Sequence, residues 1–161
     1  STPHAFIASG CYSGLSPFAS GTTGSFAALI LWYLLTALGA LNSIGAQILL
    51  FVLITALGLY STKQFLESDL NKRITSRKEG DPGVVVIDEW SGMILTLING
   101  VPMSLSYMLL GFFLFRLFDV LKPGPVDSMQ RLPGTWGVML DDVGAGFLAL
   151  IIMQIVKYNF Y

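Results

Sequence analysis

Residues 84–90 read Val-Val-Val-Ile-Asp-Glu-Trp and place two adjacent carboxylates, Asp88 and Glu89, inside an otherwise apolar segment. Apolar residues resume after this pair, from Met93 to Ile98, so the whole segment has the composition of a membrane helix. An ionisable side chain inside such a helix is costly to keep there and marks a functional site by default. We therefore expect Asp88 and Glu89 to belong to a site whose other members come from elsewhere in the chain.

The composition of the 161-residue chain is that of an integral membrane protein. Hydrophobic residues make up 53%, charged residues only 12%, and the mean hydropathy is +0.68, whereas soluble domains carry about 25% charged residues. The length predicts one membrane-embedded domain over residues 1–161. A net charge of −1 and the lack of a basic, aromatic array argue against a nucleic-acid partner. Nothing in the composition indicates an obligate protein partner.

The apolar runs predict an all-α fold, a polytopic membrane bundle of about four to five helices with a cytoplasmic amphipathic segment. Each run is bounded by turn-forming or charged residues. The predicted spans are 26–41, 44–60, 84–98, 103–121 and 143–158.

The segment between the second and third spans, residues 61–83, is basic. It holds five of the nine basic residues, Lys63, Lys72, Arg73, Arg77 and Lys78. The positive-inside rule therefore places the segment in the cytoplasm. Leu66, Leu70 and Ile74 recur every four residues, which fits an amphipathic helix on an anionic lipid surface. A solvated connector fits the charge pattern equally well.

A Gly- and Thr-rich stretch, Gly21-Thr22-Thr23-Gly24-Ser25, comes immediately before the first apolar run. It predicts a flexible loop at a helix N-terminus, where unpaired N–H groups and the helix dipole favour a phosphate. Thr22 and Ser25 are therefore candidate substrate-binding residues. The alternative is that one of these two hydroxyls serves only as a helix N-cap.

Further charged residues lie at the ends of the last two spans. Arg116 and Asp119 are three residues apart and so share a helix face, and Lys122 follows them. Asp141 and Asp142 directly precede the final span. Each group has a structural alternative when it is considered alone, an Arg116–Asp119 ion pair in one case and an acidic N-cap in the other.

Threading the spans with the basic segment inside brings all these polar groups to the cytoplasmic face. Carboxylates crowded at a low-dielectric face repel one another unless a cation neutralises them, and sites made only of oxygen ligands select hard ions such as Mg²⁺. The predicted Mg²⁺ ligands are Asp88, Glu89, Asp119, Asp141 and Asp142. The predicted catalytic residues are Asp88, Glu89, Asp119 and Asp142, one of which orients the attacking water. The predicted phosphate-binding residues are Arg116, Lys122, Thr22 and Ser25.

Four motifs in order carry a family resemblance. They are Ser-Gly-Leu-Ser-Pro with Gly-Thr-Thr-Gly-Ser, Ile-Asp-Glu-Trp, Phe-Arg-Leu-Phe-Asp-Val-Leu-Lys-Pro and Leu-Asp-Asp-Val-Gly-Ala-Gly. With these motifs the chain closely resembles the phosphatidylglycerophosphatase A family of bacterial inner-membrane lipid phosphatases, from about Ala8 to Ile155. The resemblance implies Mg²⁺-dependent hydrolysis of phosphatidylglycerophosphate to phosphatidylglycerol and phosphate by a multi-pass protein of the inner membrane, with its active site on the cytoplasmic side. The alternative is a non-catalytic membrane transporter or scaffold that uses the buried charges as ion or helix-pairing sites.

Overall fold

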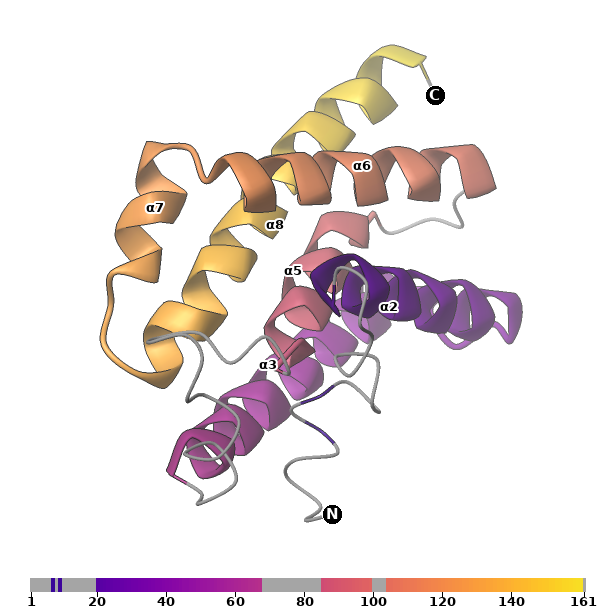
Figure 1. The fold of residues 1–161 in the computed structure, drawn as a ribbon. Coiled ribbons are helices and arrows are strands. Elements are labelled where there is room, and N and C mark those ends of the chain that lie inside the picture. Colours follow the sequence, from indigo (N-terminus) through magenta and orange to yellow (C-terminus); the bar gives the residue numbers. More distant parts are fainter. Residues whose placement is uncertain (1–6, 8, 10–19, 68–84, 100–103, 161) are drawn as a thin grey trace.

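The computed structural model describes residues 7, 9, 20–67, 85–99 and 104–160, and within these residues it is helical and contains no strand (Figure 1). The prediction of an all-α fold is therefore confirmed for this part of the chain. The helices are α2 (Ser20–Ala37), α3 (Ile44–Glu67), α5 (Ile87–Leu97), α6 (Leu105–Leu121), α7 (Gly124–Gln130) and α8 (Thr135–Phe160).

The short helix α5 lies at the centre of the bundle. It contacts α2, α3, α6 and α8, and nine of its 11 residues are buried. Its side chains Met93, Ile94 and Leu97 belong to the same hydrophobic core as Trp32 of α2 and Phe115 of α6. At about 1.5 Å per residue, α5 is roughly 16 Å long, about half the thickness of a bilayer's hydrocarbon core. It is an internal helix enclosed by longer ones.

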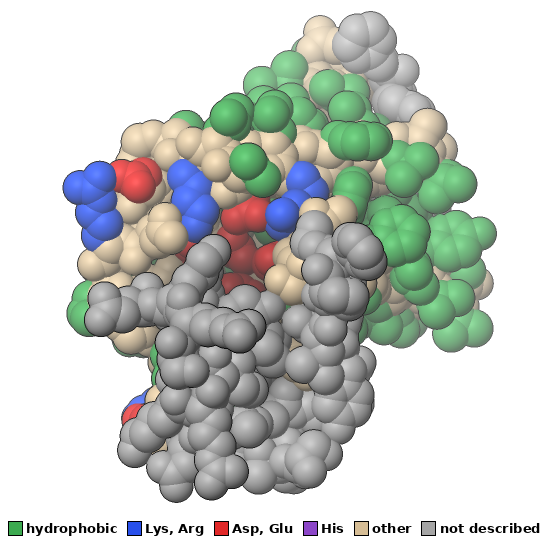
Figure 2. Space-filling view, viewed as in Figure 1, with side chains coloured by type: hydrophobic (Ala, Val, Ile, Leu, Met, Phe, Trp, Pro, Cys, Tyr) green, Lys and Arg blue, Asp and Glu red, His purple; other side chains and the backbone are tan. Residues whose placement is uncertain are grey.

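The outer surface of the bundle is apolar. Large hydrophobic side chains on α2, α3, α6 and α8 are exposed, and Figure 2 shows such side chains across the top and the right of the molecule. Exposed apolar surface of this extent marks a membrane or protein contact. Two of the described helices, Ile44–Glu67 and Thr135–Asn159, are long and apolar enough to cross a membrane. The larger predicted number of spans is not confirmed, because α5 and α6 have only 11 and 17 residues.

The Gly- and Thr-rich stretch is the first place where the predicted helix boundaries were wrong. Residues 21–25 form the start of α2, so this stretch is neither a loop nor an N-cap. Gly24 explains the difference, because a Cβ at this position would lie 2.8 Å from Val86 Cβ. The glycines let α2 pack closely against the start of α5. This packing outweighs the low intrinsic helix propensity of glycine.

The acidic pairs also occupy different helix positions from those predicted. Helix α5 begins at Ile87, so Asp88 and Glu89 lie in its first turn and not one turn inside a longer span. Helix α8 begins at Thr135, eight residues before the predicted span, so Asp141 and Asp142 lie inside the helix and do not cap it. Buried Met139 extends the apolar face of α8 in this direction.

The connection between the predicted spans 103–121 and 143–158 contains α7 and the first turns of α8. As predicted, α6 stops before Pro123, and Lys122 adopts a left-handed conformation with φ 42°. The basic segment is described only to Glu67, and this part continues α3. The rest of that segment, including Lys72, Arg73, Arg77, Lys78 and the positions of Leu70 and Ile74, lies outside the described residues.

Side chains from neighbouring helices cap the C-terminal end of α5. Lys157 Nζ donates to the carbonyl of Asn99 at 2.9 Å, and Gln154 Nε2 donates to the carbonyl of Ile98 at 3.0 Å. The backbone N–H of Asn99 in turn donates to Gln47 Oε1 of α3 at 2.9 Å. Carbonyls after a helix have no intrahelical partner, so these bonds stabilise the end of α5 that lies away from Asp88.

Candidate functional site

Charged side chains from three sequence-distant segments gather at the end of the bundle where α5 begins. Figure 2 shows acidic side chains between basic ones near the middle of this face. The acidic members are Asp88, Glu89, Asp119, Asp141 and Asp142, and the basic members are Arg116 and Lys122. We refer to these seven residues as the charged cluster.

Arg116 joins three helices through one nitrogen. Its Nη1 lies 2.6 Å from Asp119 Oδ2 on α6 and 3.3 Å from Glu89 Oε2 on α5. The same nitrogen lies 3.4 Å from Ser25 Oγ on α2, and that hydroxyl donates to Glu89 Oε2 at 3.0 Å. Arginine has five N–H donors in a planar fork. Among the described residues, every hydrogen bond of Arg116 uses Nη1, so the donors on Nη2 and Nε remain available for a bound anion.

The two neighbouring carboxylates of α5 face different partners. Successive helical residues point about 100° apart, and Glu89 faces Arg116 and Ser25 while the charge of Asp88 acts on Asp142 of α8. Asp88 also accepts a hydrogen bond from the N–H of Glu89 at 2.9 Å. Both carboxylates lie in the first turn, where the helix dipole stabilises negative charge.

Asp142 is the most deeply buried member of the charged cluster, with 4% of its surface exposed. The negative charges of Asp88, Asp119 and Asp141 all act on it. Ionised carboxylates that are crowded in a buried site repel one another, and a nearby cation relieves that repulsion.

Lys122 neutralises the other acidic residue of α8. Its Nζ lies 2.6 Å from Asp141 Oδ2. Burial by itself would lower the pKa of the Lys122 ammonium, but the hydrogen bond to Asp141 and the surrounding carboxylates raise that pKa above the ordinary lysine value. Lys122 therefore stays cationic at neutral pH and keeps a positive charge beside the acidic centre.

The backbones of α5 and α8 meet beside the charged cluster. Gly92 lies one turn after Asp88 on the same face of α5, and a Cβ at Gly92 would overlap the carbonyl oxygen of Asp142. A Cβ at Gly146 would likewise overlap the carbonyl oxygen of Gly92. Thr96 Oγ1 donates across the same contact to the carbonyl of Gly146 at 3.3 Å. This close approach sets the separation between Asp88 and Asp142.

We expect Gly92→Ala to lower the free energy of unfolding by about 1–3 kcal/mol, because the added methyl group must push α8 backbone away. Phosphatase activity should fall as well, since Asp142 moves with that backbone. Thermal unfolding in detergent and phosphate release would measure the two effects. Gly45→Ala is the matched control, since nothing lies within 4 Å of a Cβ at Gly45. Equal melting temperatures for Gly92→Ala and wild type would contradict this packing.

The role of Thr22 stays a prediction, and the structure adds two glycines to the residues that shape the site. Thr22, predicted to bind substrate, is exposed and takes part in none of the described hydrogen bonds of the charged cluster. Sequence analysis did not single out Gly92 and Gly146, which bring α5 and α8 together. A small residue every three or four positions, as at Gly21, Gly24 and Ala28, is the sequence signal for such close packing.

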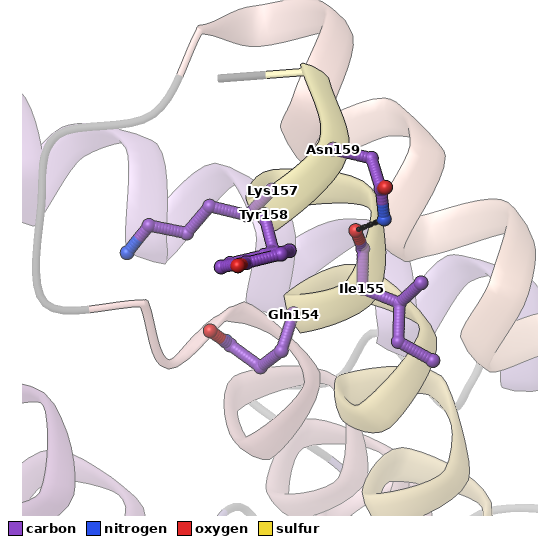
Figure 3. Close-up of a pocket in the computed structure, with 5 residues that line it drawn as sticks. All are labelled: Gln154, Ile155, Lys157, Tyr158 and Asn159. Carbon is purple, nitrogen blue, oxygen red and sulfur yellow. Dashed lines mark hydrogen bonds between the residues drawn. The ribbon is translucent and has the colours of Figure 1, made fainter.

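The C-terminal end of α8 has a separate pocket of about 660 Å³, lined by Gln154, Ile155, Lys157, Tyr158 and Asn159 (Figure 3). These five residues provide one cation and no carboxylate. The cation, Lys157, is already bonded to the carbonyl of Asn99. Asp142 and Lys157 are 15 residues apart on α8, or roughly 22 Å along the axis. The charged cluster, and not this pocket, is therefore the candidate functional site.

Comparison with known proteins identifies the family. A sequence model described as phosphatidylglycerophosphatase A matches residues 6–157. The chain belongs to this family. It is therefore a phosphatase, and the predicted family resemblance is confirmed.

Three relatives cover nearly the whole chain. Phosphatidylglycerophosphatase A of Escherichia coli K12 is 34% identical over 99% of this chain and 86% of its own length. The Haemophilus influenzae protein of the same name is 34% identical over 97% and 90%. A Bacteroides thetaiotaomicron protein provisionally named phosphatidylinositol-3-phosphatase is 36% identical over 94% and 92%. No solved structure matches the chain.

Proposed function

We propose that the protein hydrolyses phosphatidylglycerophosphate to phosphatidylglycerol and inorganic phosphate. The observation that carries this proposal is Arg116, which is fixed by Nη1 to Glu89 and Asp119 and directs no described hydrogen bond from its other nitrogens. A planar guanidinium can bind two oxygens of a phosphate at once. The names of two relatives support the lipid substrate. Family membership disfavours a non-catalytic transporter or scaffold.

Different residues of the chain would bind the phosphate and orient the attacking water. Arg116 and Lys122 bind the phosphate oxygens and stabilise the charge that develops on them, as preorganised cations do strongly where water is scarce. Glu89 lies beside Arg116 and orients the attacking water. The water oxygen forms a bond to phosphorus while the bond from phosphorus to the glycerol oxygen breaks. Glu89 accepts the proton that the water loses, a proton then passes from Glu89 to the departing glycerol oxygen, and phosphatidylglycerol leaves.

Mg²⁺ is the proposed cofactor. Among the described residues, no three His, Cys, Asp or Glu side chains lie close enough to hold a metal ion together. The chemistry of the donors nevertheless fits, because the centre is made of carboxylate oxygens and the charges of Asp88, Asp119 and Asp141 act together on buried Asp142. Asp88, Asp119 and Asp142 would hold the ion once their side chains turn toward it, while Glu89 and Asp141 hold Arg116 and Lys122. When bound, Mg²⁺ would neutralise the phosphate and the leaving oxygen.

We further propose that the protein crosses the bacterial inner membrane several times, with the charged cluster on the cytoplasmic side. The apolar exterior of α2, α3, α6 and α8 supports membrane insertion, and the basic residues at 72–78 support the orientation. A cysteine at position 77, in a Cys11→Ser background, should react with an impermeant thiol reagent in inverted vesicles and not in intact cells. Labelling in intact cells would contradict this orientation.

The function itself is tested by measuring phosphate release from phosphatidylglycerophosphate in detergent micelles. We expect turnover with Mg²⁺ and loss of turnover in a chelator. Phosphatidylinositol 3-phosphate belongs in the same assay, because one relative is named for that substrate. A higher kcat/KM for the inositol lipid would overturn the proposed substrate, and full activity in chelator would overturn the proposed cofactor.

A further inference from the structure

Three phenylalanines lie where α2 meets α6, close to Ser25 and Arg116 in the chain. Phe26 of α2 and Phe112 of α6 are in edge-to-face contact with ring centroids 6.1 Å apart, and the rings of Phe112 and Phe113 are 5.8 Å apart. Phe26 and Phe113 are exposed by 49% and 67%. We call Phe26, Phe112 and Phe113 the phenylalanine seam. In Figure 2, apolar side chains cover the right of the molecule, where Figure 1 shows α2 and the start of α6.

The phenylalanine seam lies next to the proposed phosphate-binding residues. Phe112 and Phe113 lie four and three residues before Arg116, so they sit about one turn, roughly 5–6 Å, further along α6 on the same side. Phe26 adjoins Ser25, whose hydroxyl lies 3.4 Å from Arg116 Nη1. The same two helices therefore present a cation and a hydroxyl at one level and exposed aromatic rings at the next.

A phospholipid has the same order of polar and apolar groups along its length. The phosphate is followed by the glycerol backbone and then by the first methylenes of the acyl chains. A headgroup phosphate held at Arg116 would bring those first methylenes to the level of the rings. Exposed, nearly rigid aromatic side chains offer large contact area at small entropic cost.

We propose that the phenylalanine seam binds the proximal acyl chains of the lipid substrate and so orients its phosphate toward the charged cluster. This inference rests on the proposed function, because it takes the substrate to be a phospholipid monoester. The seam is the part of the apolar exterior where aromatic rings of α2 and α6 are in contact beside Ser25 and Arg116. It contributes to substrate binding and takes no part in the chemical step.

The test compares Phe113→Ala with Phe147→Ala on two substrates. Phe147 is a matched control, because it is 55% exposed and lies five residues after Asp142 on a different helix, α8. The substrates are dioleoyl phosphatidylglycerophosphate in micelles and its deacylated, water-soluble counterpart. We expect Phe113→Ala to raise KM for the dioleoyl lipid roughly threefold to tenfold, with kcat unchanged. Its KM for the deacylated substrate should equal that of wild type.

Phe113→Trp keeps a large ring and should retain a wild-type KM for the lipid. Equal KM values for Phe113→Ala and Phe147→Ala on the lipid would overturn the seam, since any lipid-facing phenylalanine would then serve as well. An equal rise of KM on both substrates would also overturn it. Failure of the wild type to release phosphate from either substrate would instead overturn the proposed function, and the seam with it.

Discussion

Replacing Arg116 with lysine is expected to lower kcat/KM for phosphate release by roughly 10²- to 10³-fold, the usual cost of removing one preorganised charge-stabilising group. Lysine keeps the positive charge and can still reach one carboxylate. It loses the planar fork in which Nη1 holds Glu89 and Asp119 while the other donors of the same group would bind phosphate. The fall should appear in kcat, because the lost contacts strengthen as charge develops on the transferring phosphate.

The matched control is Arg131→Lys. Arg131 pairs with Asp127 on the surface of α7 and its side chain is 77% exposed, so the same substitution there should leave kcat/KM unchanged. Thermal unfolding should show that Arg116→Lys is folded. Near-normal turnover of Arg116→Lys would mean that Arg116 serves only as a structural ion pair between α5 and α6.

Asp142→Asn is expected to lower activity by roughly 10³-fold. The proposed Mg²⁺ would lose one of its ligands, and a bound metal ion stabilises the charge of the transition state by several kcal/mol. The amide keeps the shape of the side chain but removes one of several buried negative charges that act on one another. Without metal the variant should therefore be at least as stable as wild type. A substitution that lowers activity and leaves the stability of the protein intact identifies a functional residue. Replacing a residue needed for folding would lower both.

Thermal unfolding with and without Mg²⁺ provides the second readout. A ligand that binds only the folded state raises the melting temperature, so Mg²⁺ should stabilise wild type more than Asp142→Asn. High Mg²⁺ should partly restore activity to the variant. Asp127→Asn, at a half-exposed position on α7, is the control and should respond to Mg²⁺ as wild type does. Equal stabilisation of Asp142→Asn and wild type would remove Asp142 from the proposed metal site.

Much of the candidate site could be predicted from sequence. A charged side chain in an apolar segment is costly to bury, so each such residue marks a candidate site without knowledge of the fold. Glu89, Arg116 and Asp119 stand in or beside apolar runs, and the structure brings them into direct contact. Helix boundaries were predicted less well. The sequence patterns at 21–25 and 135–142 are typical of turns and caps, yet both stretches are helical because their tertiary contacts outweigh local propensity.

The sequence by itself determined the helical class, the membrane character and the family, since these depend on composition, on the spacing of apolar runs and on ordered motifs. Only the tertiary structure decided how the charges pair. Glu89 pairs with Arg116 of α6, while the charge of Asp88 acts on Asp142 of α8, whose backbone lies close to α5 where Gly92 and Gly146 leave room for it. Spacing along one helix gives the angle between two side chains, but their partners depend on which other helices pack beside it.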